Sequence, residues 1–291
     1  MKKETVVYKK VKDCPIQADI YNNSNNSPVL LYIHGGALMF GSRSWLPLNQ
    51  IELYHKAGFT VISVDYRLAP VTKLYDLVQD IRDAIQWVKS AAPQYGFDAD
   101  KLALMGGSAG GYLSLLMGTM EMKPKAIVSF YGYGDILGDW VTKPSEYYCT
   151  RPLVSKEQAL QAIEHNIVSE GDWSRFNYYL YCRQQGVWLT EMSGLDPLQD
   201  RSLLEMYNPI HNIQPDYPPA LLLHGDQDTD VPYEQSVMMH ERLRKIGVEA
   251  ELITISGADH VFDQQLFTAP EVQQAFTRVI EFLKQQLMVS D

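Results

Sequence analysis

The sequence predicts an α/β protein with a mostly parallel, eight-stranded sheet flanked by helices. Short, nearly continuous apolar runs are typical of strands that are buried on both faces of a sheet. Segments with an amphipathic helical period lie between these runs, as a parallel sheet covered by helices requires. A long stretch without any strand-like run interrupts this alternation and predicts an inserted helical segment.

The first two strands are expected to form an antiparallel pair at one edge of the sheet. Residues 5–11 and 16–21 alternate apolar and polar side chains, which is typical of strands with one exposed face. The remaining strands are expected at the apolar runs 28–34, 59–66, 101–106, 125–132, 219–225 and 249–256. Together these segments give the eight strands of the predicted sheet.

Three segments, two between strands and one after the last strand, are expected to be helices that cover the sheet. In residues 76–92, apolar side chains recur on one helical face. Residues 233–247 end in basic residues and a glycine, which is the usual composition of a helix C-terminus. Residues 271–287 carry a similar apolar stripe and form the last expected helix.

Residues 1–134 and 219–291 are predicted to form one α/β domain, and residues 135–218 a mostly helical cap inserted into it. The cap is rich in aromatic residues, most of which are expected to pack it against the sheet domain. They are Tyr147, Tyr148, Trp173, Phe176, Tyr178, Tyr179, Tyr181 and Trp188. These rings also suggest a modest apolar pocket for an acyl or aryl group.

Composition excludes several classes of protein. The 291 residues carry a formal charge of −10, which argues against nucleic-acid binding through a basic surface. No apolar window is long enough for a membrane helix, and the N-terminal residues lack the apolar core of a signal peptide. The three cysteines, Cys14, Cys149 and Cys182, have no metal-binding spacing and are expected to be free thiols of a cytoplasmic protein.

Ser108 stands between the glycine pairs Gly106-Gly107 and Gly110-Gly111, in the motif Gly106-Gly107-Ser108-Ala109-Gly110. The motif follows an apolar run and precedes a helix-like segment, the context in which a Gly-X-Ser-X-Gly turn presents a nucleophile. The start of the helix favours negative charge, and the Ala109 N–H can donate to an oxyanion. Ser108 is therefore the candidate nucleophile, which needs a base and a group that orients the base.

His260 is the candidate base among the seven histidines, because it follows the last apolar strand and can reach back over the end of the sheet. His34 and His224 are expected to be structural. Asp228 is the candidate acid, chosen from three alternating aspartates after the preceding strand, while Asp259 is too close to His260 in sequence to orient it. An EF-hand is excluded there, since Val231 and Val237 occupy its glycine and glutamate positions.

A second group of oxyanion donors is expected after the strand at residues 28–34. His34-Gly35-Gly36-Ala37 is a loop of small residues whose backbone amides can approach a substrate oxygen. The Gly36 and Ala37 N–H groups are therefore predicted to join that of Ala109 in an oxyanion hole.

These motifs resemble the α/β-hydrolase superfamily, and more closely its esterase and lipase branch related to hormone-sensitive lipase. The resemblance is carried in order along nearly the whole chain by HGGA (34–37), DYRLAP (65–70), GGSAGG (106–111), HGDQDTDVP (224–232) and ADH (258–260). The chain departs from the branch at Ala37, where a third glycine is usual, and at Val71, where glutamate is common. The position of the cap also resembles that of prolyl-oligopeptidase-like and feruloyl-esterase-like members.

The resulting expectation is a serine carboxylic-ester hydrolase that acts on small to medium acyl esters, with Ser108, Asp228 and His260 as the catalytic triad. Neither a cofactor nor a metal is expected, and the only expected partner is a small-molecule ester. An amidase or peptidase with the same triad, resembling formamidases or aminopeptidases, is the first alternative. The second is a non-catalytic ligand-binding protein on the same fold.

Overall fold

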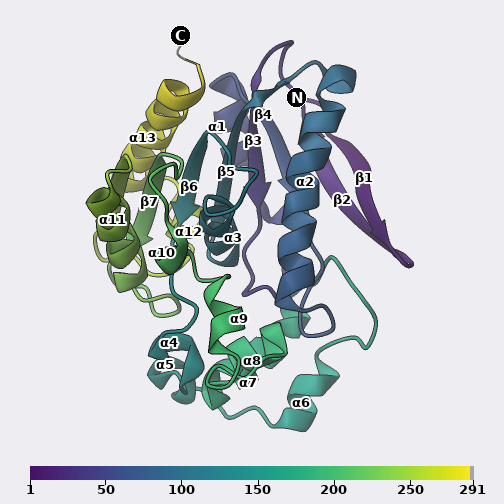
Figure 1. Ribbon diagram of the computed structural model, residues 1–291, viewed down its shortest axis with the longest axis vertical. Helices are drawn as coiled ribbons and strands as arrows, with labels where there is room; N and C mark the ends of the chain where they lie inside the picture. Colours follow the sequence, from purple (N-terminus) through teal and green to yellow (C-terminus); the bar gives the residue numbers. More distant parts are fainter. Residues whose placement is uncertain (289–291) are drawn as a thin grey trace.

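The predicted fold class is confirmed by a computed structural model, which describes residues 1–288. A single sheet of eight strands has the order β1-β2-β4-β3-β5-β6-β7-β8, and helices cover it (Figure 1). The strands are β1 (Glu4–Val11), β2 (Cys14–Tyr21), β3 (Pro28–Ile33), β4 (Thr60–Val64), β5 (Asp98–Gly107), β6 (Ala126–Phe130), β7 (Ala220–Gly225) and β8 (Ala250–Ile255).

The strand directions gather several loops at one edge of the sheet. β1 and β2 form the predicted antiparallel edge pair, and β2 is also antiparallel to β4. The pairs β3–β4, β3–β5, β5–β6, β6–β7 and β7–β8 are all parallel. The carboxyl ends of these six strands therefore lie at a common edge, where ligand sites form in sheets of this kind.

Two layers of helices bury the two faces of the sheet. One face packs on α2 (Leu74–Tyr95) and α3 (Ala109–Met117), with α11 (Glu234–Ile246) beside them. The other face packs on α1 (Leu48–Lys56) and α13 (Pro270–Leu287). Successive residues of β3 alternate between these two cores, which explains why its sequence is a continuous apolar run. The three predicted helices correspond to α2, α11 and α13.

The segment between β6 and β7, called the inserted segment below, is built mainly from short helices, most of which Figure 1 shows grouped together below the sheet. These are α4 (Asp139–Thr142), α5 (Glu146–Cys149), α6 (Lys156–Gln161), η2 (Trp173–Arg175), α7 (Phe176–Gln185), α8 (Trp188–Ser193), α9 (Arg201–Glu205) and α10 (Pro209–Asn212). Buried rings of this segment, including Tyr179 and Trp188, belong to the same apolar core as α2 and α3. The division of the chain into a sheet domain and a cap stays a prediction.

The connection from β5 to α3 brings helix and sheet unusually close together. A Cβ atom at Gly110 would overlap the carbonyl oxygen of Ile33 on β3, and one at Gly106 would overlap the backbone of Gly110. Only glycine permits this approach, because every other residue would push α3 away from the sheet.

We expect Gly110→Ala to lower the free energy of unfolding by about 2–3 kcal/mol, because the added methyl group has no space. Gly247→Ala is the control, since a Cβ there meets no atom within 4 Å and only the positive φ of 89° is unfavourable. Its cost should be about 1 kcal/mol. Denaturant unfolding of both variants measures the difference, and equal losses would contradict the close approach.

Candidate active site

Ser108 occupies a strained turn between β5 and α3. Its backbone has φ 55° and ψ −119°, a conformation that is costly for a residue other than glycine. The Ser108 N–H donates to the Phe130 carbonyl at 2.9 Å, which ties the turn to the end of β6. The turn places the hydroxyl at the carboxyl edge of the sheet, where the residue is 9% exposed.

His260 and Asp228 meet at the same edge, on the loops that follow β8 and β7. The Nδ1 atom of His260 lies 2.7 Å from Oδ2 of Asp228, whose side chain is inaccessible to solvent. The other carboxylate oxygen accepts the backbone N–H groups of Asp230 and Val231, each at 2.9 Å. Burial acts to raise the pKa of Asp228, but His260 and His224 outweigh it and hold that pKa well below its ordinary value.

His224 is a second histidine on the Asp228 carboxylate. Its Nε2 atom lies 3.2 Å from Asp228 Oδ2 and 3.0 Å from the Val231 carbonyl, and its Nδ1 atom lies 2.7 Å from the Ser236 hydroxyl. Because the Val231 carbonyl can only accept, Nε2 carries a proton, while Nδ1 is hydrogen-bonded to the Ser236 hydroxyl. From its place at the end of a buried strand, His224 was expected to be a structural residue. Its position four residues before Asp228 was the available indication of this contact.

The environment of His260 favours its protonated form. Burial acts to lower the pKa of His260, but the charge and hydrogen bond of Asp228, together with Asp230 and Asp259, raise it above 6.5. Asp259 accepts the backbone N–H of His260 at 2.7 Å, and the Tyr131 ring lies 4.6 Å from the imidazole. Asp259 therefore supports the loop, while Asp228 contacts the ring.

Ser108 and His260 line the same cavity, which has a volume of about 420 Å³. Among residues 1–288 their side chains form no hydrogen bond with each other. Such contacts are often long in the absence of substrate and shorten when substrate binds. Several aromatic rings line the wall, including Phe40, Trp45, Tyr148, Trp173, Phe176 and Tyr179.

Gly36 and Ala37 follow β3 and lie beside Ser108 in this cavity. Both have positive φ angles, 103° and 55°. Within the described part of the chain, the N–H groups of Gly36, Ala37 and Ala109 donate to no protein acceptor. Ala109 is the first residue of α3, so its N–H lacks a helical partner. Three unpaired donors thus lie near Ser108.

Two residues of the inserted segment hold this loop, and neither was predicted to contact it. The Trp188 indole N–H donates to the Ala37 carbonyl at 3.0 Å. The guanidinium of Arg175, which is 1% exposed, donates to the carbonyls of Met39 and Ala69 at 2.6 and 2.7 Å. These contacts join residues more than one hundred positions apart, and no local sequence pattern indicates them.

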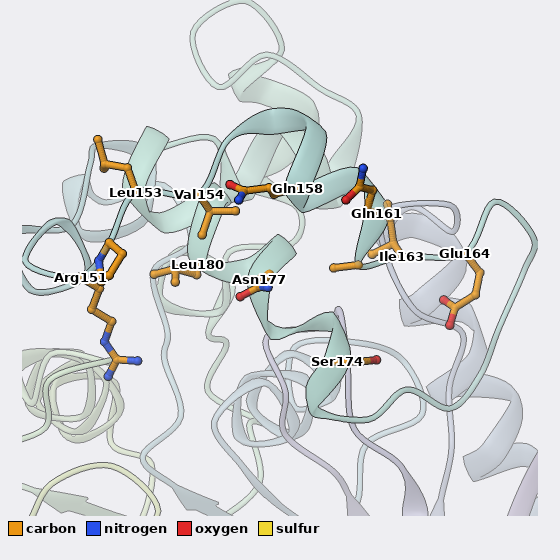
Figure 2. A pocket seen from close by; sticks show the side chains of 12 residues that line it. Arg151, Leu153, Val154, Gln158, Gln161, Ile163, Glu164, Ser174, Asn177 and Leu180 are labelled. Carbon is orange, nitrogen blue, oxygen red and sulfur yellow. The ribbon is translucent and has the colours of Figure 1, made fainter.

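A second and larger cavity, of about 770 Å³, lies on the inserted segment (Figure 2). Its wall includes Leu153, Val154, Gln158 and Asn177, and it contains none of the predicted site residues.

Across residues 1–288, no group of three or more side chains is arranged to hold a metal ion. No helix in that range is long and apolar enough to cross a membrane.

Comparison with solved structures supports the fold. An α/β-hydrolase superfamily protein from Enterococcus faecalis superimposes with a TM-score of 0.77 at 24% identity, covering 98% of this chain and 99% of that one. A thermophilic esterase from Thermogutta terrifontis gives a TM-score of 0.71 at 24% identity, covering 97% and 92%. At these identities the likeness concerns the fold alone.

Curated relatives include much longer proteins. The non-reducing polyketide synthases pkbA of Emericella nidulans and prhL of Penicillium brasilianum are each 26% identical to this chain. The alignments cover 98% and 89% of this chain but only 14% and 13% of the synthases. The chain therefore spans about one seventh of the length of these relatives.

Family models identify the chain more directly. The Dienelactone hydrolase family model matches residues 205–287, and the BD-FAE model matches residues 18–243. The second match spans β2 through most of α11 and includes Ser108 and Asp228. The chain therefore belongs to the BD-FAE family, and its fold is that of an α/β hydrolase.

Proposed function

We propose that the protein is a serine carboxylic-ester hydrolase whose catalytic triad is Ser108, His260 and Asp228. The observation that carries this proposal is the 2.7 Å pair of His260 and Asp228 at the cavity that also holds Ser108. The backbone amides of Gly36, Ala37 and Ala109 are the proposed oxyanion hole, and the enzyme needs no cofactor.

In the proposed reaction, the Ser108 hydroxyl attacks the ester carbonyl while His260 Nε2 accepts its proton. The three amides stabilise the negative charge that develops on the carbonyl oxygen, each contributing about 3 kcal/mol. His260 then gives the proton to the departing alcohol, leaving an acyl group on Ser108. Water, deprotonated by His260, releases the acid and restores the serine.

The direct test is hydrolysis of p-nitrophenyl esters of two to twelve carbons by the wild type and by Ser108→Ala. The wild type should turn over the shorter esters, and the variant should lose at least 10³-fold in kcat, because the nucleophile is absent. Ser114→Ala is the control, since Ser114 is a buried serine of α3 that bonds only the Gly110 carbonyl. Comparable activity of Ser108→Ala and wild type would refute the proposal.

Matched ester and anilide substrates separate an esterase from an amidase with the same triad. A fluorophosphonate that fails to label Ser108 would instead favour a non-catalytic binding protein.

The pH dependence should report the raised pKa of His260. Only neutral His260 can act as the base, so kcat/KM should fall as pH decreases through that pKa, with a midpoint above about 6.5. Asp228→Asn removes the charge that raises the pKa. It should move the midpoint to lower pH and reduce kcat by about 10⁴-fold.

Asp226→Asn is the matched control for Asp228→Asn, because Asp226 lies on the same loop and accepts from the Gly257 backbone N–H rather than from His260. Its pH profile should match that of the wild type. A wild-type profile that is flat between pH 5 and 8 would contradict the role of His260.

Trp188→Phe should reduce kcat by about tenfold, because the Ala37 carbonyl loses its donor and the oxyanion loop loses support. Trp87→Phe on α2 is the control, since the Trp87 ring packs beside Tyr8 of β1 and does not line the active-site cavity. Measuring kcat together with the unfolding midpoint separates loss of positioning from loss of fold. Unchanged kcat in Trp188→Phe would show that the loop does not need this bond.

A further inference from the structure

We propose that the preferred ester joins a formyl or acetyl group to an aromatic alcohol that carries a carboxylate, and that Arg151 binds this carboxylate. The proposal rests on the serine-esterase function proposed above and adds the substrate class to it. It depends on two spaces of unequal volume that Ser108 lines, and on the charged side chains around the larger space.

The position of His260 decides which side receives the alcohol. The proton that His260 takes from Ser108 must pass to the alcohol oxygen, so this oxygen has to lie within hydrogen-bond reach of the imidazole. His260 lines the cavity of about 420 Å³ and does not line a second, small space that Ser108 also lines. The alcohol part of the ester therefore occupies the large cavity, and the acyl part faces the small space.

The small space can hold very little. Its volume is about 10 Å³, and its wall includes Ala37, Tyr133, Trp140 and Trp188. A volume of this size accommodates roughly one water-sized group. The Tyr133 ring packs against Trp140 and Trp188 at centroid distances of 5.1 and 5.9 Å, so the wall is fixed by ring contacts. A hydrogen atom or a methyl group fits there, which corresponds to a formyl or an acetyl ester.

The large cavity suits a planar apolar group. Phe40, Trp45 and Trp173 pack against one another, with Trp45 and Trp173 stacked at 5.3 Å. Such rings offer flat faces and edges to an aromatic ligand at little entropic cost.

Arg151 supplies a positive charge to this aromatic cavity. Its guanidinium lies over the rings of Tyr147, Tyr148 and Phe176, at 5.1, 5.3 and 5.9 Å from their centroids. It donates to the Tyr147 hydroxyl at 2.8 Å. No carboxylate of residues 1–288 lies within ion-pair distance of it. The guanidinium therefore keeps free donors in a geometry that matches a ligand carboxylate.

The acidic side chains at the cavity already have partners. Asp230 pairs with the buried Arg183 guanidinium at 2.8 Å and accepts from the Tyr179 hydroxyl. Asp259 accepts from the Thr229 hydroxyl and backbone and from the His260 backbone. Among the described residues that line this cavity, Arg151 is thus the cation without an acidic partner, and its charge is available to a ligand.

Arg151 lines both the active-site cavity and the second cavity, but its guanidinium faces the active-site cavity. Figure 2 shows the Arg151 side chain extending away from Leu153 and Val154, which line that second cavity. Its contacts with Tyr147, Tyr148 and Phe176 place the guanidinium among residues of the active-site cavity.

In the reaction with such an ester, the bond from Ser108 Oγ to the carbonyl carbon forms and the bond from that carbon to the phenolic oxygen breaks. The serine proton passes through His260 to the phenol. The carboxylate on Arg151 takes no part in this exchange and only positions the ring. Water then releases formate or acetate from Ser108.

The test compares 3-acetoxybenzoate with its methyl ester, two acetates that differ in one negative charge. We expect Arg151→Gln to reduce the ratio of their kcat/KM values, carboxylate over methyl ester, by about tenfold or more. Arg151→Lys keeps the charge but loses the planar fork, so its loss should be smaller. Arg244→Gln removes an equal charge from the exposed face of α11 and should leave the ratio unchanged.

The acyl part is tested with 3-hexanoyloxybenzoate, which should react at less than one tenth of the kcat/KM of the acetate. A ratio that Arg151→Gln does not change would overturn the role of Arg151. Equal rates for the acetate and hexanoate would overturn the assignment of the small space.

If the wild type hydrolyses neither benzoate ester but a fluorophosphonate labels Ser108, this substrate class is wrong while the serine-hydrolase function stands. If Ser108 is not labelled either, the proposed function fails as well.

Discussion

The strained turn at Ser108 is the constraint on which the candidate site depends. β5 must end, reverse and enter α3 within a few residues, and α3 must pack almost on the backbone of β3. Glycines at positions 106 and 110 make this approach sterically possible. The same contact brings the Ala109 amide close to the loop that follows β3. The proposed nucleophile and the proposed oxyanion donors are thus positioned by one close contact between α3 and β3.

Charged and polar groups after β7 and β8 complement the geometry of the Ser108 turn. The buried Asp228 carboxylate is stabilised by two backbone amides and two histidines, so it remains ionised without access to water. Its charge in turn raises the pKa of His260 and fixes the orientation of the ring. His224, which is held by Ser236, makes the carboxylate a fixed part of the fold rather than a mobile side chain.

The inserted segment takes part in the site as well as covering it. Trp188 and Arg175 bind the loop that carries the proposed oxyanion donors, and Arg183 neutralises Asp230 near the imidazole. Folding of the segment and completion of the site are therefore coupled. The same segment supplies Arg151 and most rings of the cavity, so substitutions that alter specificity are expected to lie there.

The sequence by itself determined the sheet, its antiparallel edge and the main helices, because buried strands and amphipathic helices leave periodic apolar patterns. It also determined which residues stand at the ends of β3, β5, β7 and β8, and parallel strands necessarily bring these ends together. Only the tertiary structure decided the contacts of His224, Trp188, Arg175 and Arg151. Their partners come from distant segments or depend on side-chain direction, and no local period encodes such contacts. The unequal spaces beside Ser108 likewise arise from packing between the inserted segment and the sheet.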